Sequence, residues 1–384
     1  MSTSDSEQFD EIRPYNDSEV ADVIARLLTT PELISALTKF RFPRLSRFVP
    51  FLLRPLVMRV LSKQLKGIST VVQMQDVIAS YMQSMVDRST GRLTFTGIDQ
   101  LNPGEAYLFI SNHRDIAMDP AFVNWGLYHD GIDTARIAIG DNLLKKPYVS
   151  DLMRLNKSFI VNRSATGVRG KMKALSQLSA YIDHSITSGH SVWLAQREGR
   201  AKDGNDRTEP AILKMLYMSF KKRGLRFSEA VKALHIVPVS ISYEYDPCDA
   251  LKAMELHALA AKGGYQKSQF EDIESIVQGI VGYKGDVHVA FGRPMDAAFE
   301  TAEELAQEID RTIVSNYHLH SSNLLAAEQA VDQIAADKRA RYQSRIAGID
   351  SDSLPWFIAQ YANPVLNKQK LAALTTTEGT HEQQ

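Results

Sequence analysis

Short apolar runs, each about the length of a strand, alternate with helix-length stretches from residue 91 onward. In chain order the runs are GRLTFTGIDQL, AYLFIS, ARIAIG, KSFIVN, SVWLA, LHIVPVSIS and DVHVAFG. Strands separated by helical segments are typical of α/β proteins, in which helical crossovers join parallel strands. The pattern therefore predicts an α/β fold with a mostly parallel sheet flanked by helices.

Glycine and proline mark the ends of several of these elements. The stretches 169–189 and 209–224 have helical character and stop at Gly189 and Gly224, and we expect a strand after each. Pro238 lies within IVPVSISY, and a proline normally restricts a strand to a sheet edge or a bulge. We therefore expect an edge or bulged strand around Pro238.

Helical segments precede and follow this core. Four prolines interrupt the helical periodicity of residues 17–90, which predicts several helices there: Pro31, Pro43, Pro50 and Pro55. The expected organisation is a disordered N-terminus (1–16), a helical and membrane-interfacial domain (17–90), an α/β core (91–296), C-terminal helices (297–348), and an extension with a disordered tail (349–384).

Charge is distributed unevenly, although the formal net charge is only −1. Eight basic residues and no acidic one lie between Leu33 and Gln75. Within this region, residues 40–67 mix arginines with Phe, Leu and Val, which suits a surface that lies on anionic lipid. An amphipathic helix that docks on the protein core is the equal alternative.

The 384 residues include 44% hydrophobic ones, as expected for a globular protein with a substantial core. No run of eighteen apolar residues and no secretory signal is visible, so we expect a cytoplasmic protein on the inner face of the membrane. The single cysteine, Cys248, excludes an internal disulfide and is typical of a reducing compartment.

Candidate chemistry begins with LFISNHRDIAMDPAFVNWG at residues 108–126. The apolar run places Asn112 and His113 at the carboxyl end of a strand, where open α/β sheets carry their sites. Asp119 and Pro120 then resemble the N-cap and first residue of a helix. A carboxylate bonded to one imidazole nitrogen makes the other a better general base. A helix cap beside a surface histidine is the alternative.

Two further stretches bring cations and glycines to strand ends. The loop LAQREGRAKDGNDR at 194–207 surrounds Glu198 with arginines and glycines, a composition suited to phosphate. The stretch 139–163 adds Lys145, Lys146 and Arg163. By contrast, the HLH sequence at 318–320 has no nearby carboxylates, so we predict no metal site there.

The order of these stretches is similar to a known family. SNHRDIAMD, GDNLLKKPYV with FIVNR, REGRAKDG and IVPVSISY resemble the four consecutive blocks of the glycerolipid acyltransferases, which acylate glycerol-3-phosphate or lysophosphatidate. LTFTGIDQLNPGEAYLFISNHRD and VHVAFGRPM resemble the borders of that family's core. The resemblance thus extends over about residues 92–296, and the four ordered blocks are more specific than any single one.

The resemblance implies roles for particular residues. His113 would be the general base and Asp119 the carboxylate that orients it. The glycerophosphate site would consist of Arg163, Glu198, Gly199 and Arg200. Pro238 would belong to the acyl-donor side, and the supporting residues would be Asn112, Arg114, Lys145 and Lys146.

Two departures from the family's blocks affect these expectations. Five residues separate His113 from Asp119, whereas four are usual. Either Asp119 still reaches the histidine or Asp115 takes its role, and we favour Asp119 because the Asp-Pro pair marks a helix start. AQREGR also stands where an apolar residue and a second small residue are usual, which leaves the acceptor's identity open.

By this resemblance the chain would be an acyltransferase of phospholipid biosynthesis, with acyl-coenzyme A or acyl-carrier protein as donor and no cofactor. Lysophosphatidate is the first expected acceptor, and glycerol-3-phosphate or another lysolipid the second. Turn amides or Arg114 would stabilise the tetrahedral oxyanion. The partners would be an anionic membrane surface and, where a carrier-protein thioester is the donor, acyl carrier protein, but not nucleic acid. A thioester or lipid hydrolase and a non-catalytic lipid-binding protein are the rival classes.

Overall fold

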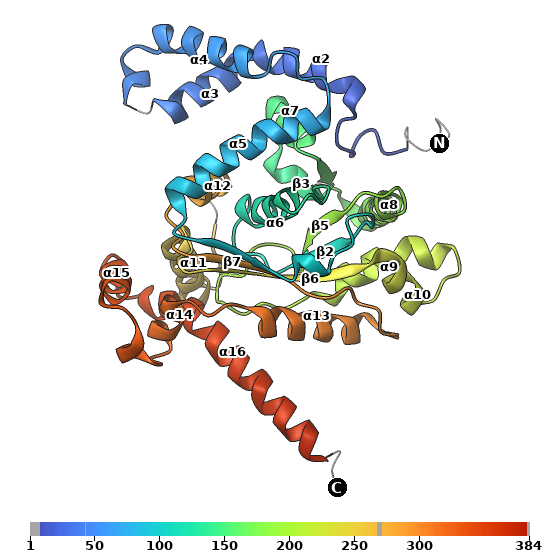
Figure 1. The fold of residues 1–384 in the computed structure, drawn as a ribbon, viewed down its shortest axis with the longest axis vertical. Coiled ribbons are helices and arrows are strands. Elements are labelled where there is room, and N and C mark those ends of the chain that lie inside the picture. Colours follow the sequence, from blue (N-terminus) through green and yellow to red (C-terminus); the bar gives the residue numbers. More distant parts are fainter. Residues whose placement is uncertain (1–7, 43, 267–270, 382–384) are drawn as a thin grey trace. The chain divides into compact units, whose positions relative to one another are not determined.

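The computed structural model describes residues 8–42, 44–266 and 271–381, with side chains up to residue 374 (Figure 1). The chain divides into two compact units. The first comprises Met1–Gln83 with Arg136–Ala174, and the second Ser84–Ala135 with Leu175–Gln384. This division cuts across the expected core of residues 91–296, because part of that range groups with the N-terminal helices.

The first unit begins with helices, as the sequence predicts for residues 17–90. They are α2 (Asp17–Leu28), α3 (Pro31–Arg41), the 3-10 turn η1 (Leu45–Arg47), α4 (Pro50–Gln64) and α5 (Val71–Ser89), whose last residues enter the second unit. Pro31 and Pro50 open their helices at the first position, where a missing N–H costs nothing, whereas Pro55 lies inside α4. Pro43 lies outside the described residues.

The same unit contains a parallel strand pair. Its elements are β3 (Arg136–Gly140), η3 (Asp141–Leu143), α7 (Pro147–Leu155), β4 (Ser158–Val161) and the start of α8 (Gly167–Thr187). Val20, Leu27, Met74 and Leu155 share one apolar core, which joins the N-terminal helices to α7. The turn before α2 belongs to this unit, and Phe9 and Ile12 are buried in it. Residues 8–16 are thus folded where we expected disorder, and residues 1–7 lie outside the described residues.

The strands match the seven predicted runs and form one sheet in the order β1-β7-β6-β2-β5-β3-β4. In the second unit they are β1 (Leu93–Thr96), β2 (Leu108–Ser111), β5 (Val192–Ala195), β6 (Ile236–Tyr243) and β7 (Val287–Phe291). β2 pairs in parallel with both β5 and β6, while β6 and β7 are antiparallel. The mostly parallel α/β fold is therefore confirmed.

The second unit also contains helices and short 3-10 turns (Figure 1). They are η2 (Ile98–Gln100), α6 (Met118–His129), the rest of α8, α9 (Pro210–Lys222), α10 (Phe227–Leu234), α11 (Asp249–Lys262), α12 (Glu271–Val281), α13 (Ala302–Asn316), α14 (Ser321–Ala326), η4 (Val331–Gln333), α15 (Ala336–Ile346) and α16 (Leu354–His381). Gly189 and Gly224 both have positive φ after a helix, as expected. A strand follows Gly189, but the helix α10 follows Gly224 before β6 begins.

Pro238 differs from its expected position, because β6 is an interior strand between β7 and β2. The ladder with β7 ends at Val239, and the carbonyl of Pro238 accepts a bond from Gly292 N at 2.8 Å on that side. The N–H and C=O of one strand residue point to the same side, so the missing donor of Pro238 falls just beyond the regular ladder. The strand therefore keeps its pairing with β2.

The C-terminal region also differs from the sequence prediction. Instead of a disordered tail, α16 continues to His381, with Phe357, Tyr361 and Val365 buried on one side. It packs against α11, α13 and α14 within the second unit. Among the described residues, no helix is both long enough and apolar enough to cross a membrane.

Candidate active site

Strand β2 delivers the candidate residues to the carboxyl edge of the sheet in the second unit. All four of its residues are buried, and Ser111 O accepts a bond from Gln196 N at 2.8 Å, just past the end of β5. Asn112 and His113 follow at this edge. Because a buried strand fixes the direction in which the chain leaves it, the position of His113 is set by the sheet.

His113 and Asp119 are paired. Nδ1 of His113 lies 2.8 Å from Oδ2 of Asp119, whose carboxylate is fully buried. The ring also meets Trp193 edge to face at 5.8 Å. An ionised carboxylate only accepts, so Nδ1 carries the proton and Nε2 keeps its lone pair. Within the described part of the chain, no residue hydrogen-bonds Nε2.

The Asp119 carboxylate is held by further donors. Its Oδ2 also accepts from the backbone N–H groups of Arg114 (2.6 Å) and Asp115 (2.9 Å), and its Oδ1 accepts from the Tyr243 hydroxyl at 2.6 Å. Burial, and then the Asp119 charge, raise the pKa of Tyr243 well above its ordinary value, so this hydroxyl keeps its proton. These donors fix the orientation of Asp119 relative to His113.

Asp115 has a different position from Asp119. Its Oδ1 accepts from the N–H groups of Ala117 and Met118, both at 2.9 Å, at the start of α6. Burial, and then the neighbouring Asp119, raise the pKa of Asp115 to about 6. Asp115 Oδ2 is buried and has no hydrogen-bond partner in the described residues. No bond joins Asp115 to the His113 ring.

The expected helix start needs a correction. α6 begins at Met118 with Ala117 as N-cap, so Asp119 lies inside the first turn and does not cap it. The reason is that Asp115 already serves the first free N–H groups of α6. The carboxylate of Asp119 turns back to His113 and to the two N–H groups of the preceding turn. The extra residue between His113 and Asp119 thus lies in a turn that is held together by the bonds of Asp119 to its first two N–H groups.

A buried ion pair supports the other side of the turn. Arg114 donates to Asp206 Oδ2 at 2.6 Å and lies over the Tyr317 ring at 5.6 Å. Burial opposes the charge of Arg114, but Asp206 outweighs it and the pKa of Arg114 rises. Asn112 donates to the same Asp206 oxygen and exchanges two bonds with the backbone of Ile241. Both supporting residues are therefore structural contacts between strand ends.

The loop 196–207, which contains the third sequence block, is hydrogen-bonded to the backbone of His113. Ala201 N donates to the backbone oxygen of His113 at 2.8 Å. Glu198 and Gly199 are exposed, with Gly199 at φ +77°, and Arg200 donates to Ser275 Oγ on α12 at 3.3 Å. Gln196, one of the residues that depart from the family block, is fully buried, and its side-chain amide lacks a partner among described residues.

The remaining predicted residues belong to the first unit. Lys145 and Lys146 are exposed just before α7, where Lys146 is the N-cap. Arg163 is exposed after β4, and its backbone N–H donates to Asp141 at 3.1 Å. Bonds from Ser164 and Arg163 outweigh the effect of burial and lower the pKa of Asp141. Arg163 thus follows a strand end, as the sequence predicts, whereas Lys145 and Lys146 lie between the 3-10 turn η3 and α7.

Three residues of the site were not singled out from the sequence. Tyr243 contacts Asp119, Asp206 contacts Arg114, and Trp193 contacts His113. Tyr243 and Asp206 are the last or near-last residues of blocks that the sequence does mark. A count of strand positions from Pro238 would have placed Tyr243 at the same sheet edge, which was the available signal.

The other polar clusters carry little chemistry. Burial, and then Asp246, raise the pKa of the Cys248 thiol to about 11, so it is not a nucleophile at neutral pH. His288 bonds Thr94 at 2.8 Å and lies near His318, which in turn lies near His320. Among the described residues, no group of three or more His, Cys, Asp or Glu side chains has the arrangement of a metal site.

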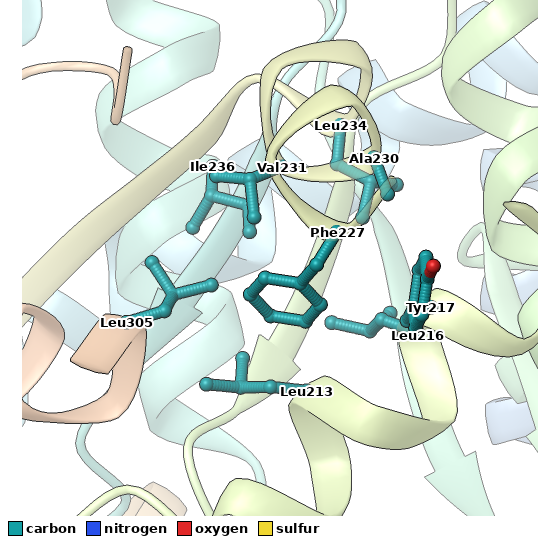
Figure 2. A pocket seen from close by; sticks show the side chains of 9 residues that line it. All are labelled: Leu213, Leu216, Tyr217, Phe227, Ala230, Val231, Leu234, Ile236 and Leu305. Carbon is teal, nitrogen blue, oxygen red and sulfur yellow. The ribbon is translucent and has the colours of Figure 1, made fainter. Parts of the chain in front are cut away.

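A small apolar cavity of about 10 Å³ lies between α9, α10, β6 and α13 (Figure 2). Leu213, Phe227 and Leu305 point into it, and none of the site residues lines it. A volume of this size holds at most about one water molecule and no acyl chain. The cavity is a packing gap in the core.

Comparison with known proteins gives a family for this region. Residues 92–242 match the family model described as Acyltransferase, and this range includes His113, Asp119 and the loop 196–207. This part of the chain is therefore similar to the acyltransferase family. The resemblance of the sequence blocks to that family is therefore confirmed, while the role of each residue stays a prediction.

Curated acyltransferases are similar to a large part of the chain. A glycerol-3-phosphate acyltransferase of Pseudoalteromonas translucida is 25% identical over 246 residues, which cover 59% of this chain and 28% of that protein. Another, from Pseudoalteromonas atlantica, is 27% identical over 195 residues, covering 50% and 22%. The matched region thus spans only about a quarter of the length of these relatives.

A solved acyltransferase structure also aligns with this chain. It is the crystal structure of the 1-acyl-sn-glycerophosphate acyltransferase PlsC from Thermotoga maritima, with 17% identity and a TM-score of 0.34. The alignment covers 62% of this chain and 77% of the other.

Proposed function

We propose that the chain transfers a fatty acyl group from a thioester donor to a hydroxyl of a glycerophosphate acceptor, in phospholipid biosynthesis. The observation that carries this proposal is the His113–Asp119 pair at the carboxyl edge of the sheet, inside the segment that matches the acyltransferase family model. The names of the curated relatives support a glycerol-3-phosphate acceptor, and the sequence blocks also suit its 1-acyl derivative.

In the proposed reaction, His113 Nε2 takes the proton of the acceptor hydroxyl as the oxygen attacks the thioester carbonyl. The new C–O bond gives a tetrahedral oxyanion, which collapses as the C–S bond breaks. The thiolate leaves and takes up the proton that His113 holds, so that the base is restored. Asp119 stabilises the imidazolium between these steps through Nδ1.

The expected oxyanion donors need revision. The N–H groups of Arg114 and Asp115 already donate to Asp119, and the Arg114 guanidinium is buried against Asp206. A backbone N–H that donates to a buried carboxylate cannot also meet an oxyanion without breaking that bond, and the guanidinium of Arg114 is buried and directed at Asp206. We therefore assign Arg114 to the support of the turn instead of to the oxyanion.

The acceptor phosphate is assigned to the exposed part of the loop 196–207. Gly199 has open space around its Cα, and Arg200 lies next to it, so a phosphate can approach the backbone there. Glu198 would orient Arg200 or a hydroxyl of the acceptor. Arg163 remains a phosphate-binding prediction from the sequence blocks, and Lys145 and Lys146 remain predicted supporting residues.

An anionic membrane surface is the proposed partner of the first unit. Phe48 and Phe51 are 79% and 67% exposed, and no residue of α4 is buried. Arg44, Arg47 and Arg54 lie among these apolar side chains. Exposed aromatic residues interleaved with arginines favour binding to anionic headgroups, so the protein would be peripheral on the inner face of the membrane.

The deciding assay follows labelled acyl groups from acyl-coenzyme A or acyl-carrier protein to glycerol-3-phosphate or 1-acylglycerol-3-phosphate in mixed micelles. We expect a labelled phospholipid product with one of these acceptors, and none with His113→Ala. Label that appears only as free fatty acid would identify a hydrolase instead. Lipid binding without turnover in any combination would identify a non-catalytic binding protein.

A further inference from the structure

Helix α16 contacts the loop 196–207, although the two lie about 150 residues apart in the chain. Asn363 Nδ2 donates to the backbone oxygen of Asp203 at 2.6 Å. Asn367 Nδ2 donates to the side-chain oxygen of Asn205 at 3.1 Å. Because residues 363 and 367 are one helical turn apart, both amides face the same side of α16. That side is the one on which the loop lies.

The backbone of α16 is adapted to the same contact. Pro364 lies inside the helix and has no N–H, so it cannot bond the carbonyl of Gln360 four residues earlier. A Cβ added to Gly204 would lie 2.4 Å from this carbonyl oxygen and 3.1 Å from Pro364 Cδ. Gly204 also has φ +79°, which side chains other than glycine rarely adopt. The loop therefore approaches α16 at the turn that the proline opens.

The helix is itself anchored in the second unit. The Tyr361 hydroxyl donates to Asp249 at 2.7 Å and accepts from Asp246 N at 2.9 Å, while Gln360 donates to Asp249 O at 3.1 Å. Arg345 forms an ion pair with the same Asp249 carboxylate. The position of α16 is thus fixed by buried polar contacts that do not involve the loop.

The contact continues from the loop to the candidate base. Asp206, two residues after Gly204, binds Arg114 and Asn112, which flank His113. On the other side, Ala201 bonds the backbone oxygen of His113. Glu198 and Gly199, which are exposed, and Arg200, which is half-buried, precede these two fixed points. The segment 203–205, which α16 contacts, lies between the two fixed points in the same loop.

We propose that Asn363, Asn367 and Gly204 are positioning residues, through which α16 sets the conformation of the loop that binds the acceptor phosphate. This inference rests on the proposed function, and it assigns a role to a helix that lies outside the family-matched residues 92–242. None of the three residues is placed against substrate. Their effect is transmitted through the loop backbone.

The test uses the full chain with Asn363→Ala and Asn367→Ala combined, and Gln369→Ala as control. Gln369 is an exposed amide on the same helix. We expect the double variant to raise the KM for the acceptor about tenfold, with donor KM nearly unchanged, as for lost ground-state binding. We also expect faster amide hydrogen exchange in residues 197–208, but wild-type exchange in Tyr361 and its neighbours. The control should match wild type in both measurements.

A second variant, Gly204→Ala, tests the close approach without touching α16. The added Cβ must displace the loop from the Gln360 carbonyl, so acceptor KM and loop exchange should rise together. Unchanged exchange in both variants would overturn the inference, because the contacts then do not hold the loop. Faster exchange with an unchanged acceptor KM would also overturn it. If wild type transfers no acyl group at all, the proposed function fails, while hydrogen exchange still decides whether α16 holds the loop.

Discussion

The turn 112–119 and helix α4 both mix arginine with apolar residues, yet they differ in every physical respect. In the turn, Arg114 and Asp119 are buried. Arg114 forms an ion pair with Asp206, and Asp119 is paired with His113. In α4 no residue is buried, and Phe51 and Leu52 are more than 60% exposed. The charges of Arg114 and Asp119 thus find their partners within the protein. Helix α4 instead leaves a basic and apolar surface that an external partner can cover.

The difference shows why a mixture of arginine and apolar residues can support either catalysis or binding to a lipid surface. A general base needs a fixed tautomer, and the fixed tautomer needs donors and acceptors that cannot rearrange. Binding to a lipid surface needs only apolar area and positive charge, with no particular geometry. We therefore expect single substitutions in the turn to have large effects on activity. In α4, each substitution should have a smaller effect on lipid binding, and these effects should add.

The largest effect is expected from His113→Ala. Removal of the base should lower kcat for acyl transfer by about 10²–10⁴-fold. The reason is that no other described side chain at the site is oriented by a carboxylate to accept the proton of the acceptor hydroxyl. His257→Ala, a histidine on α11 outside the site, is the matched control. A variant at His113 that retains more than a tenth of the wild-type rate would contradict the assignment.

The second prediction compares the two carboxylates of the turn. Asp119→Asn should lower kcat about a hundredfold, since an amide nitrogen then faces groups that need an acceptor. Asp115→Asn keeps an acceptor for the N–H groups of Ala117 and Met118, so it should change kcat only severalfold. Steady-state rates of the two variants decide between them. The reverse ranking would assign the orienting role to Asp115.

The third prediction concerns membrane binding by the first unit. Replacing Arg41, Arg44 and Arg47 with glutamate should lower flotation with anionic liposomes at least about tenfold, because each cation near the headgroups contributes about 1 kcal/mol. Binding should also weaken with salt. Flotation equal to wild type would exclude this surface as the membrane contact.

Two controls make the flotation result specific. Glutamate at Lys232, Lys262 and Lys370 makes the same charge change at exposed positions of the second unit, and should leave flotation nearly unchanged. Phe51→Ser with Leu52→Ser keeps every charge and should reduce binding that persists in high salt. The two classes of variant thus separate the electrostatic and apolar contributions.

The smallest effect is on stability and comes from Asp115. Its folded pKa of about 6 lies above the ordinary value of 3.8, so the ionised form is disfavoured in the fold. Wild type therefore loses stability relative to Asp115→Asn as pH rises from about 4 to 6, by about 3 kcal/mol at most. Urea unfolding of both proteins at pH 4 and pH 7 measures this difference. A difference that does not depend on pH would contradict the raised pKa.

The sequence was most informative where a pattern is local. Each predicted strand is a short apolar run between breakers, and all seven are present. The pairing of His113 with Asp119 was also within reach, since both follow one strand. The predicted start of α6 is two residues late, because Asp115 and not Asp119 serves the first N–H groups.

Contacts between distant segments were out of reach. A count of strand positions places Tyr243 at the sheet edge, but neither Tyr243 nor Asp206 signals its bond to Asp119 or Arg114, because these bonds depend on how the ends of β6, β2 and β5 align. The same holds for α16, which lies in the region that the sequence predicts to be an extension with a disordered tail (349–384). By local rules, Pro364 is a helix breaker. Its role becomes visible only in the structure, where Gly204 approaches the helix at the turn that the proline opens.

The place of α16 in the chain has a consequence for biosynthesis. Every strand of the sheet is translated before α16, so His113 and Asp119 can meet while the loop 196–207 still lacks its contacts with Asn363 and Asn367. A partly synthesised chain on the ribosome would then contain the base, while the loop proposed to bind the acceptor would not yet be held by α16. Under the proposed function, nascent chains released before residue 367 would contain the His113–Asp119 pair and yet bind the acceptor poorly.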